Sequence, residues 1–329
     1  MIVHRRQILR SSLAAASLGA SIAAPLSAAA QTYPARQVRV IVPFAPGGPN
    51  DLAARLIAQK LSDQFGKPFI VDNIAGAGGN IGMGQAARAA PDGHTLLVAA
   101  PTLVTNPSLF ERVPYDLQRD FAPVTIAVTA PTVLTVHPSV EARTVAELIA
   151  LIRANPGRHS YASPGVGTPP HLLGELFRLS LQLDLVHAPF SSGGLAIASA
   201  VGGHTPISFG ALPPAVPHVR DGRLRALAIT SARRAEALPE VPAMAEAGHP
   251  DIAGDIWTAV LVPAGTPGEI VDVLYREIVR IIALPDVKAR LDSLGYEAFA
   301  PTPAASAAQM RHEATKWAAL IRAAGIRAQ

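Results

Sequence analysis

The chain of 329 residues contains 26 glycines, 30 prolines and no cysteine, and 28 basic against 24 acidic residues give a net charge of +4. Its 49% apolar content excludes a disordered chain, and the lack of cysteine excludes disulfides, thiolate metal sites, thiol nucleophiles and lipid-modified cysteine. The length suggests about two domains, and the scattered basic residues argue against a nucleic-acid-binding face.

Residues 1–30 have the pattern of an export signal. A basic start, MIVHRRQILR, precedes a short run rich in alanine, leucine and isoleucine at residues 13–24. The small residues at 28–30 predict cleavage before Gln31. The pair Arg5-Arg6 resembles a twin-arginine signal, and an ordinary Sec leader with adjacent arginines fits as well. No later stretch of that length is free of charges and prolines, so we expect a freely diffusing periplasmic protein.

The mature chain alternates short apolar runs with amphipathic helices, which is typical of α/β proteins. The first part predicts three strands and two intervening helices. Short loops between them imply a parallel sheet with right-handed crossovers. These strands are expected at residues 38–42, 69–71 and 95–99, and the helices at about 50–65 and from about residue 80 to 90.

A long β-prone stretch at residues 124–136, interrupted by Pro131, is expected to run from one lobe to the next, and residues 256–262 could cross back. The crossings predict a first lobe of residues 31–128 plus 255–329 and a second of 129–254. The C-terminal helix should pack on the first lobe. The other expected elements are helices at 145–154, 169–181, about 265–283 and 303–324, and strands at 159–162, 185–188, 206–209 and 224–230.

Two loops carry the functional signal: a first loop at residues 43–51 and a second loop at residues 162–171. Each follows a strand, is rich in glycine and proline, and leads into a helix with a capping residue, Asn50 or Asp51 in one and Thr168 in the other. Unpaired amides at a helix start attract anions, and glycines allow close approach. Neither loop contains lysine or arginine, so amides, hydroxyls and water would hold a carboxylate better than a polyphosphate. Two ordinary strand–helix turns are the alternative.

Other motifs carry less weight. Residues 82–87 fit G-x-G-x-x-A, but no strand directly precedes them, so we interpret residues 76–84 as a close-packed loop beside the cleft. The histidines show no metal-ligand spacing. Asp51 is interpreted as a cap or an acceptor for a ligand hydroxyl or ammonium. His171, in the first helical turn, could reach the cleft and could pair with Ser163 as base and nucleophile, although no acid is placed to orient it.

Several segments in a fixed order resemble the Bug family of periplasmic solute-binding proteins, the receptors of tripartite tricarboxylate transporters. The resemblance covers essentially the whole mature chain. Its segments are APGGPND (45–51), GAGGNIG (76–82), PDGHTLL (91–97), YASPGVGT (161–168), LRALAIT (224–230) and Trp257 with PAGTP (263–267).

The resemblance implies a two-lobed periplasmic-binding fold of the flytrap type (type II), each lobe a mostly parallel sheet flanked by helices, that closes on one small carboxylate. Asn80 and Thr102 fall where the family lines the pocket. The expected ligand-binding residues are Phe44, Ala45, Pro46, Gly47, Gly48, Pro49, Asn50, Asp51, Asn80, Thr102, Ala162, Ser163, Gly165, Val166, Gly167, Thr168 and His171.

The chain departs from the family pattern at two places. Pro189-Phe190-Ser191-Ser192 stands where the family often has Pro-Tyr-Lys-Gly, and residues 210–213 lack a frequent acid. Loss of the acid disfavours an amino-acid ligand, whose ammonium needs an anionic partner, so a plain organic or aromatic acid is preferred.

We therefore expect a monomeric, non-enzymatic receptor that delivers a carboxylate to membrane permease subunits, with no cofactor, metal or nucleic acid. An exported hydrolase using Ser163 and His171, and a sensor partner of a membrane kinase, are the alternatives.

Overall fold

The first sheet begins with three parallel strands. In the computed structural model, which describes residues 33–328 except 48 and 294, β1 (Val38–Val42) lies between β2 (Phe69–Asn73) and β3 (Thr95–Ala99). All three strands are confirmed, and both pairs are parallel as expected. The export signal and Gly48 lie outside the described residues.

Helices connect these strands. α1 (Pro49–Phe65) buries Ala53, Ile57 and Leu61 in the core of the first sheet. A short 3-10 turn, η1 (Ala77–Gly79), leads into α2 (Asn80–Ala87). At Gly82 an added Cβ would lie 2.7 Å from the carbonyl oxygen of Ile74, so this segment is close-packed, as the sequence predicts. Two further helices follow, α3 (Thr102–Leu109) and α4 (Leu117–Asp120).

Two long antiparallel strands join the first sheet to the second. β4 (Phe121–Val136) pairs with β9 (Asp255–Pro263) as far as Pro131, opposite Asp255. From Thr132 onward β4 pairs with the second sheet instead. The expected interruption at Pro131 is wrong: the strand continues, because the residue without an N–H lies where β4 changes partners.

The second sheet combines parallel and antiparallel pairs. β5 (His159–Ser163) lies between β6 (Leu185–Pro189) and β7 (Ile207–Ala211), and both pairs are parallel. β7 and β8 (Arg225–Ile229) pair antiparallel with β4. The groups β2-β1-β3 and β7-β5-β6 are thus parallel, whereas the antiparallel pairs with β4 and β9 make the sheets mixed.

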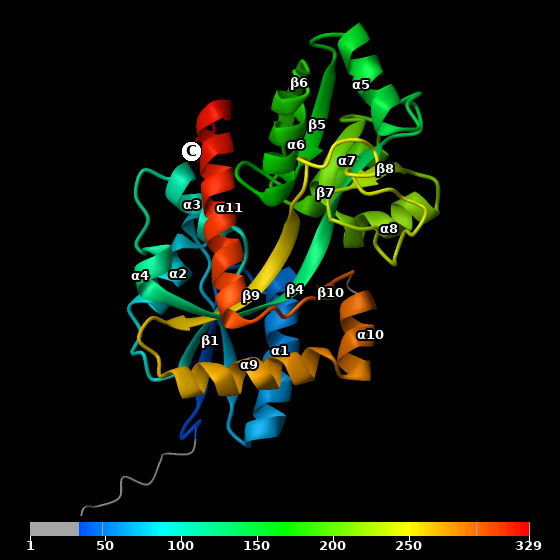
Figure 1. Ribbon diagram of the computed structural model, residues 1–329. Helices are drawn as coiled ribbons and strands as arrows, with labels where there is room; N and C mark the ends of the chain where they lie inside the picture. The colour runs from blue at the N-terminus through cyan, green and yellow to red at the C-terminus, as the bar shows by residue number, and fades with distance from the viewer. Residues whose placement is uncertain (1–32, 48, 294, 329) are drawn as a thin grey trace, which may run out of the picture. The chain divides into compact units, whose positions relative to one another are not determined.

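Helices flank the second sheet and complete the chain (Figure 1). The second sheet carries α5 (Val145–Ala154), α6 (Pro169–Ser180), α7 (Gly193–Val201) and α8 (Leu212–Arg220). The chain then adds α9 (Gly268–Ile282), α10 (Pro285–Ser293), the short β10 (Glu297–Ala298) and α11 (Pro303–Ala324). Within the described residues, no helix is long and apolar enough to cross a membrane.

The C-terminal helix α11 does more than the sequence suggests. It lies along α3 and β4 of the first part, as expected, and it also contacts α6 of the second sheet. Trp317 of α11 sits beside Gly254, with Leu173 of α6 on the same spot. The helix therefore bridges elements of both sheets instead of packing on the first alone.

Candidate functional site

A cavity of about 740 Å³ brings the two predicted loops together. Phe44 reaches it from the first loop, and Pro164 and Thr168 reach it from the second. The crossing strands contribute Ala130 and Ile256. Its other lining residues are Pro169, Pro170, Ser191, Ser192, Gly193, Gly194, Ile197, Ala211, Pro213, Pro214, Ser293 and Tyr296.

The first loop is held in place by the carboxylate of Asp51. This buried group accepts hydrogen bonds from the Gly47 amide (2.8 Å), Arg55 Nε (2.9 Å) and Asn73 Nδ2 (2.9 Å). Burial would raise the pKa of Asp51, but the bonds from Arg55, Gly47 and Asn73 lower it. With three internal donors on its oxygens, Asp51 serves as an anchor for the loop.

The rest of the first loop contributes little to the cavity wall. Asn50 Oδ1 accepts a hydrogen bond from Thr258 Oγ1 (2.6 Å), which ties α1 to β9. Ala45, Pro46 and Gly47 are exposed. Phe44 is therefore the first-loop residue that lines the cavity among those the structure describes.

The second loop is closed by its own hydrogen bonds. The Gly165 amide donates to Ser163 Oγ (3.3 Å), the Gly167 amide to His171 Nδ1 (3.0 Å), and Thr168 Oγ1 to the Gly165 carbonyl (2.8 Å). Together with Gly47, these glycines already have acceptors inside the protein. The expectation that their amides are bare donors for an anion is thus not met.

The first turns of α6 and α7 differ in the backbone N–H donors that they offer a ligand. α6 begins with Pro169 and Pro170, which have no N–H, so two of its first-turn donors are missing. α7 begins with Gly193 and Gly194, and its cap Ser192 accepts a bond from the Leu195 amide (3.3 Å). Ser192 and both glycines line the cavity. Sequence reasoning missed this start, although a small polar cap followed by two glycines after β6 repeats the pattern of the two loops.

Two stacked histidines form hydrogen bonds with the second loop. The rings of His171 and His187 are 3.8 Å apart between centroids. Burial, reinforced by His187, lowers the pKa of His171 to about 3. Burial also lowers the pKa of His187 to about 4. Both rings are therefore neutral at neutral pH.

Ser163 pairs with His187 and not with His171. The Ser163 Oγ and His187 Nε2 atoms lie 2.7 Å apart, and the Ser163 side chain is fully buried. The Ser163–His171 pair that the hydrolase alternative requires is not formed, because His171 Nδ1 accepts from the Gly167 amide. A buried hydroxyl without access to the cavity is poorly placed as a nucleophile.

The remaining expected residues do not line this cavity. Asn80 Oδ1 accepts a bond from Asn106 Nδ2 (2.8 Å), so the side chain is held inside the first part of the protein. Thr102 Oγ1 is buried with no hydrogen-bond partner among the described residues. Ala162 is fully buried on β5, and Val166 is exposed.

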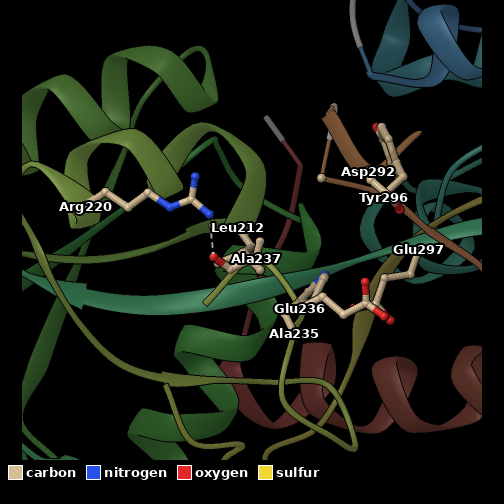
Figure 2. Close-up of a pocket in the computed structure, with 10 residues that line it drawn as sticks. Leu212, Arg220, Ala235, Glu236, Ala237, Asp292, Tyr296 and Glu297 are labelled. Atoms are coloured by element: carbon tan, nitrogen blue, oxygen red, sulfur yellow. Dashed lines mark hydrogen bonds between the residues drawn. The ribbon is translucent and has the colours of Figure 1, made fainter. Parts of the chain in front are cut away.

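A second, smaller crevice of about 230 Å³ is acidic (Figure 2). Glu236, Asp292 and Glu297 line it, and burial together with the charges of Glu236 and Asp292 raises the pKa of Glu297. Arg220 donates to the Ala237 carbonyl (3.0 Å) instead of neutralising these acids. An organic anion would be repelled here, so the larger cavity is the better candidate.

The chain is similar to known proteins over most of its length. The protein BugT of Bordetella pertussis is 37% identical over 310 residues, covering 94% of each chain. A solved R. palustris protein with adipate has a TM-score of 0.78 and 31% identity, covering 90% of this chain and 99% of that one. MatC from Rhodopseudomonas palustris, with bound malate, has a TM-score of 0.74 and 32% identity, covering 88% of this chain and all of that one.

The solved periplasmic binding protein BugD, with a TM-score of 0.75 and 31% identity over 90% of this chain, has the same α/β fold, which is consistent with two lobes. The sequence model of the tripartite tricarboxylate transporter family receptor matches residues 53–326. The chain belongs to this receptor family.

Proposed function

We propose that the protein is an extracytoplasmic receptor that binds a small organic carboxylate in the 740 Å³ cavity. It hands the ligand to the membrane permease subunits of a tripartite tricarboxylate transporter. The observation that carries this proposal is the convergence of Phe44 and Thr168, from the two loops, on one cavity without an acidic side chain. The adipate and malate in related structures support the same class of ligand.

Within the cavity, hydroxyl and amide groups of the second sheet would hold the carboxylate. Thr168, Ser192 and the first-turn glycines of α7 border the space, and small anions are stabilised at helix starts. Asp51, Ser163 and His171 do not line the cavity. Their hydrogen bonds hold the loops that carry Phe44 and Thr168. An amino acid is disfavoured, because no described residue of the lining supplies an anion for its ammonium.

Ligand capture would involve hinge closure of two lobes. The proposed lobes are residues 31–128 with 255–329, and residues 129–254. The two crossing strands β4 and β9 form the link between them. A hinge at such a connection would concentrate the backbone change in a few residues at the ends of elements. Residues 1–30 would direct export to the periplasm, by the Sec or the twin-arginine route, and be removed before Gln31.

Titration of the chain from Gln31 with a panel of carboxylates tests the proposal. Calorimetry should find micromolar binding, and saturation at 100 times the dissociation constant should stabilise the fold by about 2.7 kcal/mol. Phe44→Ala should weaken the affinity about tenfold, because it removes one apolar wall of the cavity.

Phe299→Ala is the matched control, since this phenylalanine is 49% exposed and does not line the cavity. A protein freed of bound ligand that binds no acid of a broad panel contradicts the proposal. Turnover of esters or amides that disappears in Ser163→Ala would support the hydrolase instead.

A further inference from the structure

The geometry points to a narrower ligand class: the cavity selects monocarboxylates with an apolar aryl or alkyl body, and Ser191 is the position that sets this selectivity against dicarboxylates. This inference rests on the proposed function and refines the same site. It depends on three properties of the cavity, namely its charge, its walls and its polar groups.

No charged side chain lines the cavity among the residues that the structure describes. The two internal residues outside the description, at positions 48 and 294, are a glycine and a leucine, which carry no charge either. Asp255 precedes the lining residue Ile256 on β9, and successive strand residues point to opposite faces. The carboxylate of Asp51 is occupied by its own three donors.

The walls are apolar on several sides. Phe44 belongs to the first loop, Ile197 to α7, Ile256 to β9 and Tyr296 to the segment between α10 and β10. Prolines at 164, 169, 170, 213 and 214 add rigid apolar surface without N–H donors. Such walls favour a ring or an alkyl chain over a chain bearing hydroxyl groups, which would lose their water partners.

The polar groups of the cavity suffice for one carboxylate only. The hydroxyls of Ser191 and Ser192 and the first-turn amides of α7 form one group of donors. The other lining hydroxyls of this kind are engaged, because Thr168 Oγ1 donates to the Gly165 carbonyl and Ser293 Oγ to the Arg290 carbonyl. A second carboxylate would meet the apolar Phe44 and Ile256 and at most the hydroxyl of Tyr296, and it would have no cation to offset its lost hydration. A dicarboxylate should therefore bind more weakly than the matched monocarboxylate.

Ser191 lies at a position where one cation would make the dicarboxylate bind more tightly than the monocarboxylate. It lines the cavity, it is exposed, and it precedes the cap of α7, so a longer side chain there can extend without displacing the core. A lysine at this position would supply the missing positive charge inside the cavity. The small neutral serine thus excludes the second carboxylate.

Calorimetric titration with two matched pairs tests the inference: 4-methylbenzoate against terephthalate, and hexanoate against adipate. In the unmodified protein at least one monocarboxylate should bind ten times or more tighter than its dicarboxylate. Ser191→Lys should raise the affinity for that dicarboxylate at least tenfold and narrow or reverse the ratio. Ser191→Gln, which is longer but uncharged, should not reverse it.

The outcomes separate the inference from the proposed function. Dicarboxylates that bind the unmodified protein as tightly as their partners, or binding confined to hydroxylated acids such as malate, overturn the inference while the receptor function stands. A ratio that Ser191→Lys and Ser191→Gln change alike refutes the role of Ser191. Failure of every acid in a broad panel overturns the receptor function itself.

Discussion

At the scale of single residues, the polar groups of both loops point mostly into the protein. Asp51 holds the Gly47 amide, Ser163 the Gly165 amide and His171 the Gly167 amide. Each pairing satisfies a backbone donor that would otherwise be lost inside a tight turn. The sequence identifies these residue types, but it does not tell whether a side chain faces a ligand or its own loop.

Gly167 is the residue where this packing is tightest. Its φ of +78° is a left-handed conformation, and a Cβ there would lie 2.4 Å from Leu109 Cδ1 on α3. Gly167→Ala should destabilise the fold by about 1–3 kcal/mol, because strain and a clash add. It should also lower carboxylate affinity at least threefold by shifting the second loop. Thermal unfolding and calorimetry measure the two effects.

Gly268→Ala is the control for this change, since nothing lies within 4 Å of the added Cβ and the residue opens α9. Its stability should match or slightly exceed that of the unmodified protein. If Gly167→Ala behaves like Gly268→Ala in both measurements, the contact between the second loop and α3 has no role in shaping the site.

At the scale of elements, the sequence predicts what periodicity and caps encode. The strands at β1 and β3 and the helices α5 and α11 have the expected bounds, because apolar runs and caps such as Thr144 and Thr302 mark their ends. The sequence predicts one long crossing stretch at residues 124–136, but the change of partners from β9 to β7 next to Pro131 could not be predicted, since it depends on tertiary pairing.

Short proline-rich and glycine-rich helices were the elements that pattern did not reveal. α8 has prolines at 213, 214 and 217, and α7 opens on two glycines, so local propensity favours loops in both. Their packing against β7 and against each other overrides that propensity. Because α7 and α8 line the cavity, the failure to predict these two helices also left part of the candidate site unpredicted.

The stability of the segments that carry the stacked histidines, the second loop with α6 and β6, should decrease in acid. In the unfolded chain a histidine titrates near its ordinary pKa, whereas in the fold His171 and His187 stay neutral down to about pH 3 and 4. Below pH 6.5 the unfolded state binds more protons, so stability falls as the pH drops. Each ring contributes a slope of up to about 1.4 kcal/mol per pH unit.

His171→Asn removes one of these titrations while its amide oxygen can still accept from the Gly167 amide. The variant should show a shallower loss of stability between pH 6.5 and 4, measured by denaturant unfolding at each pH. His312→Asn, at an exposed position of α11, serves as the control and should keep the original slope. An unchanged slope in His171→Asn would refute the assignment of acid sensitivity to the stacked pair.

At the scale of the whole described chain, the link between the two sheets combines strands, a helix and buried acids. β4 and β9 carry the connection, and α11 covers it, with Trp257 Nε1 donating to Glu313 Oε2 (2.8 Å). Asp255 begins β9 opposite Pro131, and its Oδ1 is buried with no hydrogen-bond partner among the described residues. Burial first, and then the charges of Glu297 and Glu313, raise the pKa of Asp255 to about 7.

This buried acid makes the fold less stable as the pH rises from about 4 to 7. The unfolded chain releases the proton of Asp255 near pH 3.8, whereas the fold retains it to about pH 7, so stability decreases as the pH rises through that interval. Asp255→Asn keeps the shape and removes the charge. The gain in unfolding free energy should be small below pH 4, grow by up to about 1.4 kcal/mol per pH unit, and level off above pH 7. Asp272→Asn, at an exposed position of α9, should show no such dependence, and a constant or absent gain in Asp255→Asn would mean that this carboxyl ionises freely inside the folded link.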